Sequence, residues 1–144
     1  MTTLPLVAGA NPNRPLRVLI ADDYGDAADS LAVLLEMAGC VVRVVYDGAE
    51  VVPTAAEFEP DACVLDLWMP SQDGWDAART LRVTRGADEL LLVAVTGLED
   101  RPAVECSLEA GFDFHWVKPV PADKLFKLLA EFAGRPRELA AIAG

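Results

Sequence analysis

Five side chains that could share one reaction stand at the ends of apolar runs in this sequence. Asp22 and Asp23 follow the first run, Asp66 ends another, and Thr96 and Lys118 follow two more. Helical crossovers between parallel strands bring the carboxyl ends of neighbouring strands to one edge of a sheet. We therefore predict that three carboxylates, a hydroxyl group and an ammonium group meet at that edge. Taken singly, an acid could instead cap a helix, Thr96 could be a loop hydroxyl and Lys118 a solvated charge.

Repulsion between the carboxylates indicates what this cluster could bind. Two carboxylates about 4 Å apart repel by roughly 4 kcal/mol at an effective dielectric near 20, so three acids need a partner of opposite charge. A divalent cation offsets the repulsion, and carboxylate, carbonyl and water oxygens are the ligands that Mg²⁺ prefers. A phosphoryl group on Asp66 would then find the metal, the ammonium group of Lys118 and the hydroxyl group of Thr96 as partners. The pattern predicts a phosphoryl-transfer site.

Alternating strands and helices must position these residues. Apolar runs of strand length alternate with segments of helical period, which indicates an α/β fold with a doubly wound parallel sheet. The predicted strands are residues 16–21, 41–46, 61–66, 90–95 and 112–117. Two helices are predicted at about 26–38 and 122–132, and two more begin near Gly74 and near Pro102. A further helix should follow Asp47, its candidate N-cap, and should kink or restart at Pro53.

Length, charge and cysteine content narrow the setting. The 144 residues suit one domain, which we place at 15–134 between tails at 1–14 and 135–144. The net charge of −11 disfavours direct nucleic-acid binding. No apolar run reaches the ~18 residues of a membrane span, and we expect a cytoplasmic protein. Cys40, Cys63 and Cys106 lack metal-binding spacing and are expected to be packed free thiols.

Four segments of the sequence resemble, in order and spacing, the receiver domain of two-component response regulators. They are VLIADD, VLDLWMPSQDGWD, AVTG and VKPV, and the resemblance covers about residues 16–132. Each motif alone is weakly specific, whereas the ordered set is strongly specific. The resemblance implies the flavodoxin-like receiver fold, with five parallel strands in the order 2-1-3-4-5.

The resemblance also implies a role for each residue of the cluster. Matched position by position, Asp66 is the phosphoacceptor, Asp22 and Asp23 are the acidic pair, Thr96 is the switch hydroxyl and Lys118 contacts the phosphoryl group. The cofactor implied is Mg²⁺. Its candidate ligands are the carboxylates of Asp22, Asp23 and Asp66 and the backbone carbonyl group of Trp68.

The segment around Lys118 carries two further expectations. By the same resemblance, the peptide bond between Lys118 and Pro119 should be cis. Three residues before Lys118, many receivers have Tyr or Phe, whose ring turns inward when the switch hydroxyl moves, and here the residue is His115. His115 is either a surface residue on an edge strand or a switch residue, and we do not expect it to accept phosphate.

The implied function is signalling, with self-catalysed phosphotransfer and slow autodephosphorylation as the only chemistry, so the protein is not an enzyme. A histidine kinase or a histidine phosphotransfer protein would supply the phosphoryl group. Because few residues follow Phe132, we expect output through a downstream effector protein that binds the fourth helix, fifth strand and fifth helix. A homodimer stays open. The chain could be free-standing or an excised receiver of a hybrid sensor kinase.

Three other functions share parts of this pattern. A receiver-like module that binds partners without phosphorylation fits the fold but leaves the intact acidic set unexplained. A nucleotide or flavin binder of the same topology needs a Gly/Ser/Thr-rich loop where this chain has Asp22-Asp23-Tyr24. A haloacid-dehalogenase-type phosphatase has its second acid two residues after the nucleophile, where this chain has Trp68.

Overall fold

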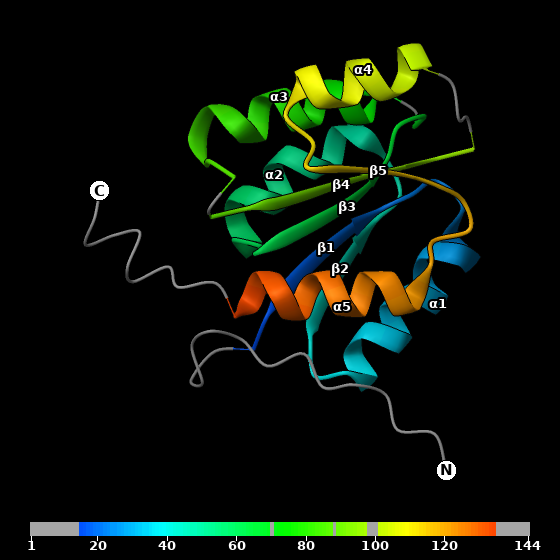
Figure 1. Cartoon of the computed structure of the whole chain (residues 1–144), viewed down its shortest axis with the longest axis vertical. Helices are drawn as coiled ribbons and strands as arrows, with labels where there is room; N and C mark the ends of the chain where they lie inside the picture. The colour runs from blue at the N-terminus through cyan, green and yellow to red at the C-terminus, as the bar shows by residue number, and fades with distance from the viewer. Residues whose placement is uncertain (1–14, 70, 88, 98–100, 135–144) are drawn as a thin grey trace.

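A parallel sheet runs through the centre of the structure (Figure 1). The computed structural model describes residues 15–69, 71–87, 89–97 and 101–134. Within them the sheet has five strands in the order β2-β1-β3-β4-β5, and every pair is parallel, which confirms the predicted topology. The strands are β1 (Arg17–Ala21), β2 (Val41–Val45), β3 (Ala62–Asp66), β4 (Leu91–Thr96) and β5 (Phe114–Val117).

Helices cover both faces of the sheet (Figure 1). One face carries α1 (Gly25–Met37) and α5 (Ala122–Ala133), and the other carries α2 (Val51–Phe58), α3 (Gly74–Thr84) and α4 (Arg101–Ala110). Because neither face meets water, β3 and β4 are buried along their whole length, as their unbroken apolar sequences predict. Among the described residues, no helix combines the length and the hydrophobicity that crossing a membrane requires.

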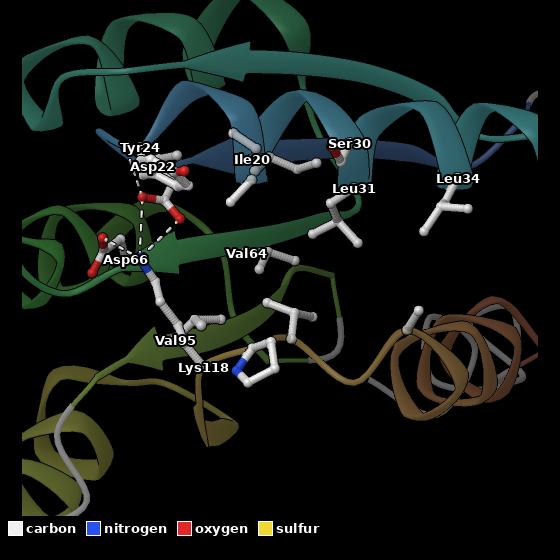
Figure 2. Close-up of a pocket in the computed structure, with 16 residues that line it drawn as sticks. Ile20, Asp22, Tyr24, Ser30, Leu31, Leu34, Val64, Asp66, Val95 and Lys118 are labelled. Atoms are coloured by element: carbon white, nitrogen blue, oxygen red, sulfur yellow. Dashed lines mark hydrogen bonds and ion pairs between the residues drawn. The ribbon is translucent and has the colours of Figure 1, made fainter.

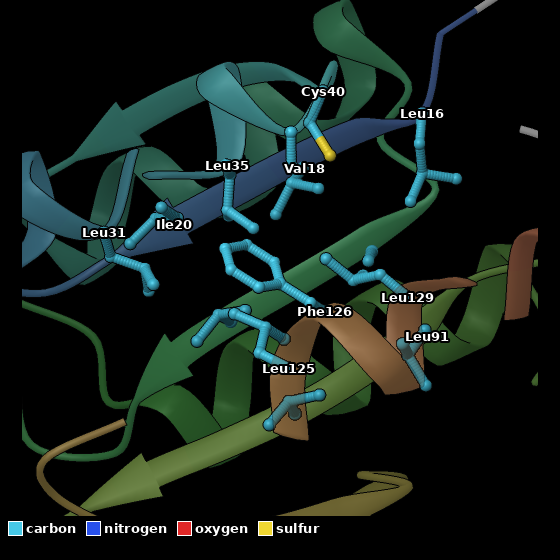
Figure 3. Packing of buried hydrophobic residues seen from close by; sticks show 14 of the residues in the cluster. Leu16, Val18, Ile20, Leu31, Leu35, Cys40, Leu91, Leu125, Phe126 and Leu129 are labelled. Atoms are coloured by element: carbon cyan, nitrogen blue, oxygen red, sulfur yellow. The ribbon is translucent and has the colours of Figure 1, made fainter. Parts of the chain in front are cut away.

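Two apolar layers hold the helices on the sheet. Successive side chains of a strand point to opposite faces, so Val18 and Ile20 of β1 belong to the layer under α1 and α5, and Leu19 belongs to the opposite layer. In the first layer the ring of Phe126, from α5, lies close to Leu35 of α1 (Figure 3). This burial leaves the polar side chains concentrated at the ends of the strands.

The second helix differs from its prediction in where the chain breaks. The carboxylate of Asp47 accepts a hydrogen bond from the backbone N–H of Ala49 at 2.9 Å and caps a short 3₁₀ turn, η1 (Gly48–Glu50). The α-helix α2 then starts at Val51, so Pro53 lies in its first turn. Backbone N–H groups in a first turn have no carbonyl partner within the helix, and proline costs nothing there. The break therefore precedes Pro53 instead of occurring at it.

Two other predictions need correction. The fifth strand begins at Phe114 and not at residue 112, because the N–H of Phe112 bonds back to the carbonyl of Ser107 at 3.0 Å and closes α4. Cys40 and Cys63 are buried free thiols as expected, but Cys106 is exposed. The buried stripe of α4 includes Ala103 and Ser107, and Cys106 lies outside it. The predicted tails, 1–14 and 135–144, lie outside the described residues.

Two leucines of α5 offer a matched test of this packing. Leu125 has no exposed surface, whereas Leu128, three residues on, is partly exposed. Leu125→Ala should lower the free energy of unfolding by about 2–5 kcal/mol, because it leaves a cavity between α5 and the sheet. Leu128→Ala should cost clearly less. Urea denaturation followed by circular dichroism measures both values, and equal losses would contradict the packing described.

Candidate functional site

The carboxyl ends of the strands bring the predicted cluster together. Asp22 directly follows β1, Asp66 ends β3, Thr96 ends β4 and Lys118 directly follows β5. Asp22, Asp23 and Asp66 each offer a carboxylate oxygen within 4.8 Å of the others. Asp22 and Asp66 are buried, and Asp23 is exposed. Side chains separated by up to 96 positions in the sequence therefore form one acidic site at the edge of the sheet.

Lys118 bridges two of these carboxylates (Figure 2). Its Nζ lies 2.9 Å from Oδ2 of Asp66 and 3.0 Å from Oδ2 of Asp22. The peptide bond that follows, between Lys118 and Pro119, is cis. The backbone N–H of Lys118 donates to the carbonyl oxygen of Thr96 at 2.8 Å, and this hydrogen bond joins the ends of β4 and β5.

Local hydrogen bonds fix the two buried carboxylates. Oδ1 of Asp22 accepts from the N–H of Tyr24 at 2.9 Å, and Oδ1 of Asp66 accepts from the N–H of Trp68 at 3.1 Å. Both bonds reach two residues along the chain, a geometry in which an aspartate turns the backbone away from the strand. Neither acid after β1 caps α1, since the helix starts after Tyr24 and has no side-chain cap.

Burial dominates the acidity of Asp66. Desolvation raises the pKa of Asp66 from 3.8 to about 6, although hydrogen bonds from Lys118 and Trp68 and the charge of Lys118 lower it. The charge of Asp22 raises it further. Desolvation lowers the pKa of Lys118, but its hydrogen bonds and ion pairs with the two aspartates outweigh this and raise it above its usual value. At neutral pH the site therefore holds an ionised Asp66 against a protonated Lys118.

An apolar cavity opens beside the acidic site, between α1 and the connection from β5 to α5 (Figure 2). Its volume is about 510 Å³, and its lining includes Leu31 and Leu34 of α1 and Val120. Asp66 and Lys118 also line it. The buried carboxylate is thus reached along an apolar wall.

His115 is tied to two residues that the sequence did not single out. Its Nδ1 lies 2.8 Å from Oγ of Ser107 in α4, and the indole N–H of Trp75 in α3 donates to the same Oγ at 3.0 Å. The indole ring of Trp75 packs edge-on against that of Trp68, with centroids 5.1 Å apart. His115 is half-buried on the edge strand β5, and its ring is hydrogen-bonded to α4, so both interpretations stay open. A polar Ser107 in a stripe of small buried residues was the signal available for this link.

The hydrogen bonds of Ser107 favour one tautomer of His115. Oγ of Ser107 lies 3.0 Å from the carbonyl oxygen of Ala103, to which it can donate its single proton. With the proton placed there, the hydroxyl oxygen accepts from Trp75 and from Nδ1–H of His115. Nε2 of His115 is buried and has no hydrogen-bond partner among the described residues.

Comparison with known proteins identifies the family. The sequence model of the response regulator receiver domain matches residues 18–130. The chain belongs to this family. The receiver is 33% identical over 109 residues to the DNA-binding response regulator MtrA of Mycobacterium tuberculosis, a match that covers 76% of this chain and 46% of MtrA. It therefore spans about half the length of the curated relatives it matches.

Solved structures share the fold of this receiver. A CheY-like receiver domain protein from Methanospirillum hungatei superposes with a TM-score of 0.76 at 24% identity, covering 82% of this chain and 93% of that one. A response regulator from Chloroflexus aurantiacus gives a TM-score of 0.74 at 26% identity, covering 85% and 100%. Receiver domains of two-component response regulators are signalling modules and not conventional enzymes.

The Asp66 carboxyl group should titrate near pH 6 in metal-free buffer, because desolvation outweighs the effect of Lys118. Its pKa in the folded receiver lies above the ordinary 3.8, so the stability it contributes is complete below that pH and is lost as the pH rises through about 6. Lys118→Met should move the midpoint upward, since Lys118 lowers this pKa. Carbon-detected NMR measures both midpoints, and a wild-type midpoint at or below 3.8 would contradict the expectation.

Ser107→Ala should lower the free energy of unfolding by about 2–4 kcal/mol, because Trp75 Nε1–H and His115 Nδ1–H both lose their buried acceptor. The matched control is Ser30→Ala on the exposed side of α1, which should stay within about 0.5 kcal/mol of wild type. Nitrogen-15 NMR of His115 adds a direct readout, since the wild-type ring should carry its proton on Nδ1. A ring protonated only on Nε2 would show that the assignment is wrong.

Proposed function

We propose that this receiver accepts a phosphoryl group on Asp66 from a phosphohistidine and signals through a protein-binding surface. The observation that carries the proposal is the bridge of Lys118 to Asp66 and Asp22, with Asp23 in the same acidic group. It places an ammonium group beside the carboxylate that would carry the new phosphoryl group. The donor would be a histidine kinase or a histidine phosphotransfer protein.

The acidic group fits Mg²⁺ by the chemistry of its donors. Three carboxylates within 4.8 Å provide hard oxygen ligands, and one ammonium group leaves net negative charge among them. Asp22, Asp23, Asp66 and the backbone carbonyl group of Trp68 would hold the ion. The N–H of Trp68 already bonds to Asp66, so its backbone lies beside the site. The bound ion would supply charge neutralisation to the phosphoryl oxygens.

The residues of the chain perform the transfer itself. With a pKa of about 6, Asp66 is largely ionised at neutral pH and can act as the nucleophile. Its oxygen forms a bond to phosphorus as the N–P bond of phosphohistidine breaks, and the imidazole leaves with that electron pair. Lys118 stabilises the charge on the phosphoryl oxygens, and the hydroxyl group of Thr96 bonds to one of them once the transfer is complete.

The output surface is formed by α4, β5 and α5. Leu108 of α4 and Phe114 of β5 are exposed apolar side chains in this region, 59% and 40% accessible, which suits a protein partner or a second copy. His115 joins β5 to α4 through its hydrogen bond with Ser107, so a movement of one element would displace the other. With a net charge of −11, this chain is not expected to bind nucleic acid directly.

Intact-mass analysis with a small phosphodonor tests the proposal. Wild type should gain one phosphoryl group when Mg²⁺ is present and none when a chelator removes it. Asp66→Asn should gain none, because the amide is not a nucleophile under these conditions. The matched control is Asp76→Asn, a substitution at an exposed aspartate of α3, which should be phosphorylated like wild type.

Two results of this experiment would count against the proposal. Modification that survives in Asp66→Asn would show that the acceptor lies elsewhere. A wild type that binds Mg²⁺ but never gains mass would favour a receiver-like module that works without phosphorylation.

A further inference from the structure

The connection from β3 to α3, residues 67–73 with Pro70 outside the described part, is held by a close contact from another connection. A Cβ atom placed on Gly48, in η1, would lie 1.6 Å from the backbone oxygen of Gln72 and 2.6 Å from its carbonyl carbon. The φ angle of Gly48 is not left-handed, so the requirement for glycine is one of space. The two backbones therefore lie in direct contact, with no room for a side chain between them.

A side-chain bond strengthens the same contact. Oδ2 of Asp47 accepts from the hydroxyl group of Ser71 at 3.1 Å, while its Oδ1 caps η1 through Ala49. Ser71 has a φ of +69°, a left-handed conformation that costs a non-glycine residue of the order of 1 kcal/mol. The bond to Asp47 helps to hold this conformation of Ser71 against η1.

The opposite end of the connection rests on the phosphoacceptor strand. A Cβ atom on Gly74 would lie 2.6 Å from the backbone oxygen of Asp66, and the N–H of Gly74 donates to the carbonyl oxygen of Leu67 at 3.0 Å. Trp68 lies between these two supports, bonded to the side chain of Asp66 through its own N–H. Described residues before and after Trp68 are thus held by contacts with other segments.

We infer that Gly48 and Asp47 are positioning residues for the metal site, because they hold the connection that presents the Trp68 carbonyl group. This inference rests on the proposed function, in which that carbonyl group is a ligand of Mg²⁺. The side-chain hydrogen bonds of Asp47 go to Ala49 and Ser71, and Asp47 is not a member of the acidic group. Their effect should appear as selectivity between cations, since Mg²⁺ requires near-ideal octahedral geometry and Ca²⁺ tolerates displaced ligands.

The test is the substitution Gly48→Ala, assayed by calorimetric titration with Mg²⁺ and, separately, with Ca²⁺. The added methyl group must push residue 72 away and move the connection. We expect the Kd for Mg²⁺ to rise about tenfold and that for Ca²⁺ to rise less than about threefold. Gly86→Ala is the matched control, because a Cβ there meets nothing within 4 Å, and both Kd values should equal those of wild type.

A second pair of variants covers the case in which Gly48→Ala does not fold. Asp47→Ala removes both hydrogen bonds of the carboxylate and should weaken Mg²⁺ binding about fivefold, with a smaller effect on Ca²⁺. Asp47→Asn should restore binding to within about twofold of wild type, since its oxygen can cap η1 and its NH₂ group can donate to Ser71. Restoration by an uncharged residue would separate positioning from electrostatic attraction.

The outcomes distinguish this inference from the proposed function. If folded Gly48→Ala, or Asp47→Ala in its place, binds both cations as wild type does, the positioning role is overturned while phosphoryl transfer to Asp66 can stand. Equal weakening of both cations would also overturn it, because a displaced carbonyl ligand should discriminate between them. If wild type itself fails to bind Mg²⁺, the proposed metal site and the positioning role fall together.

Discussion

Repulsion among three carboxylates is the constraint around which this receiver is arranged. At a separation of 4.8 Å, two such charges repel by roughly 3 kcal/mol at an effective dielectric of 20. Lys118 offsets part of this by contacting Asp66 and Asp22 together. One ammonium group cannot neutralise three acids. The repulsion that is left must therefore be compensated by the favourable free energy of folding in the rest of the domain. The proposed cation-binding site is therefore built at the expense of local stability.

The packing of the apolar sheet holds the three carboxylates together despite their repulsion. β3 is buried on both faces, so Asp66 stands on a strand that is packed by helices from both sides. The turns after β1 and β3 are then fixed by hydrogen bonds to the same carboxylates, from Tyr24 and Trp68. Burial raises the pKa of Asp66 to about 6, and the contacts with Lys118 and Trp68 keep it low enough for ionisation at neutral pH. Packing, turn geometry and acidity thus all converge on one carboxylate.

Strand periodicity and βα alternation were sufficient to predict a doubly wound parallel sheet and the meeting of its strand ends. The strand order came from the resemblance to receiver domains. The sequence pattern was less informative about the direction in which a side chain points and about close contacts between two backbones. The inward turn of His115 depends on Ser107 and Trp75, which lie 8 and 40 positions away in the sequence. The role of Gly48 depends on a contact with residue 72 that no local pattern encodes. The helix break predicted at Pro53 was wrong, because a proline is tolerated in the first turn of a helix.

The unequal environments of the three cysteines have a practical consequence. Burial raises the pKa of Cys40 to about 11 and that of Cys63 to about 12, so neither is an accessible thiolate at neutral pH. Cys106 is exposed on the outer side of α4, one residue before the Ser107 that joins α4 to β5. A maleimide fluorophore added to the native chain would attach at this single position. The native sequence therefore provides a site for fluorescent labelling on α4, a helix of the proposed output surface.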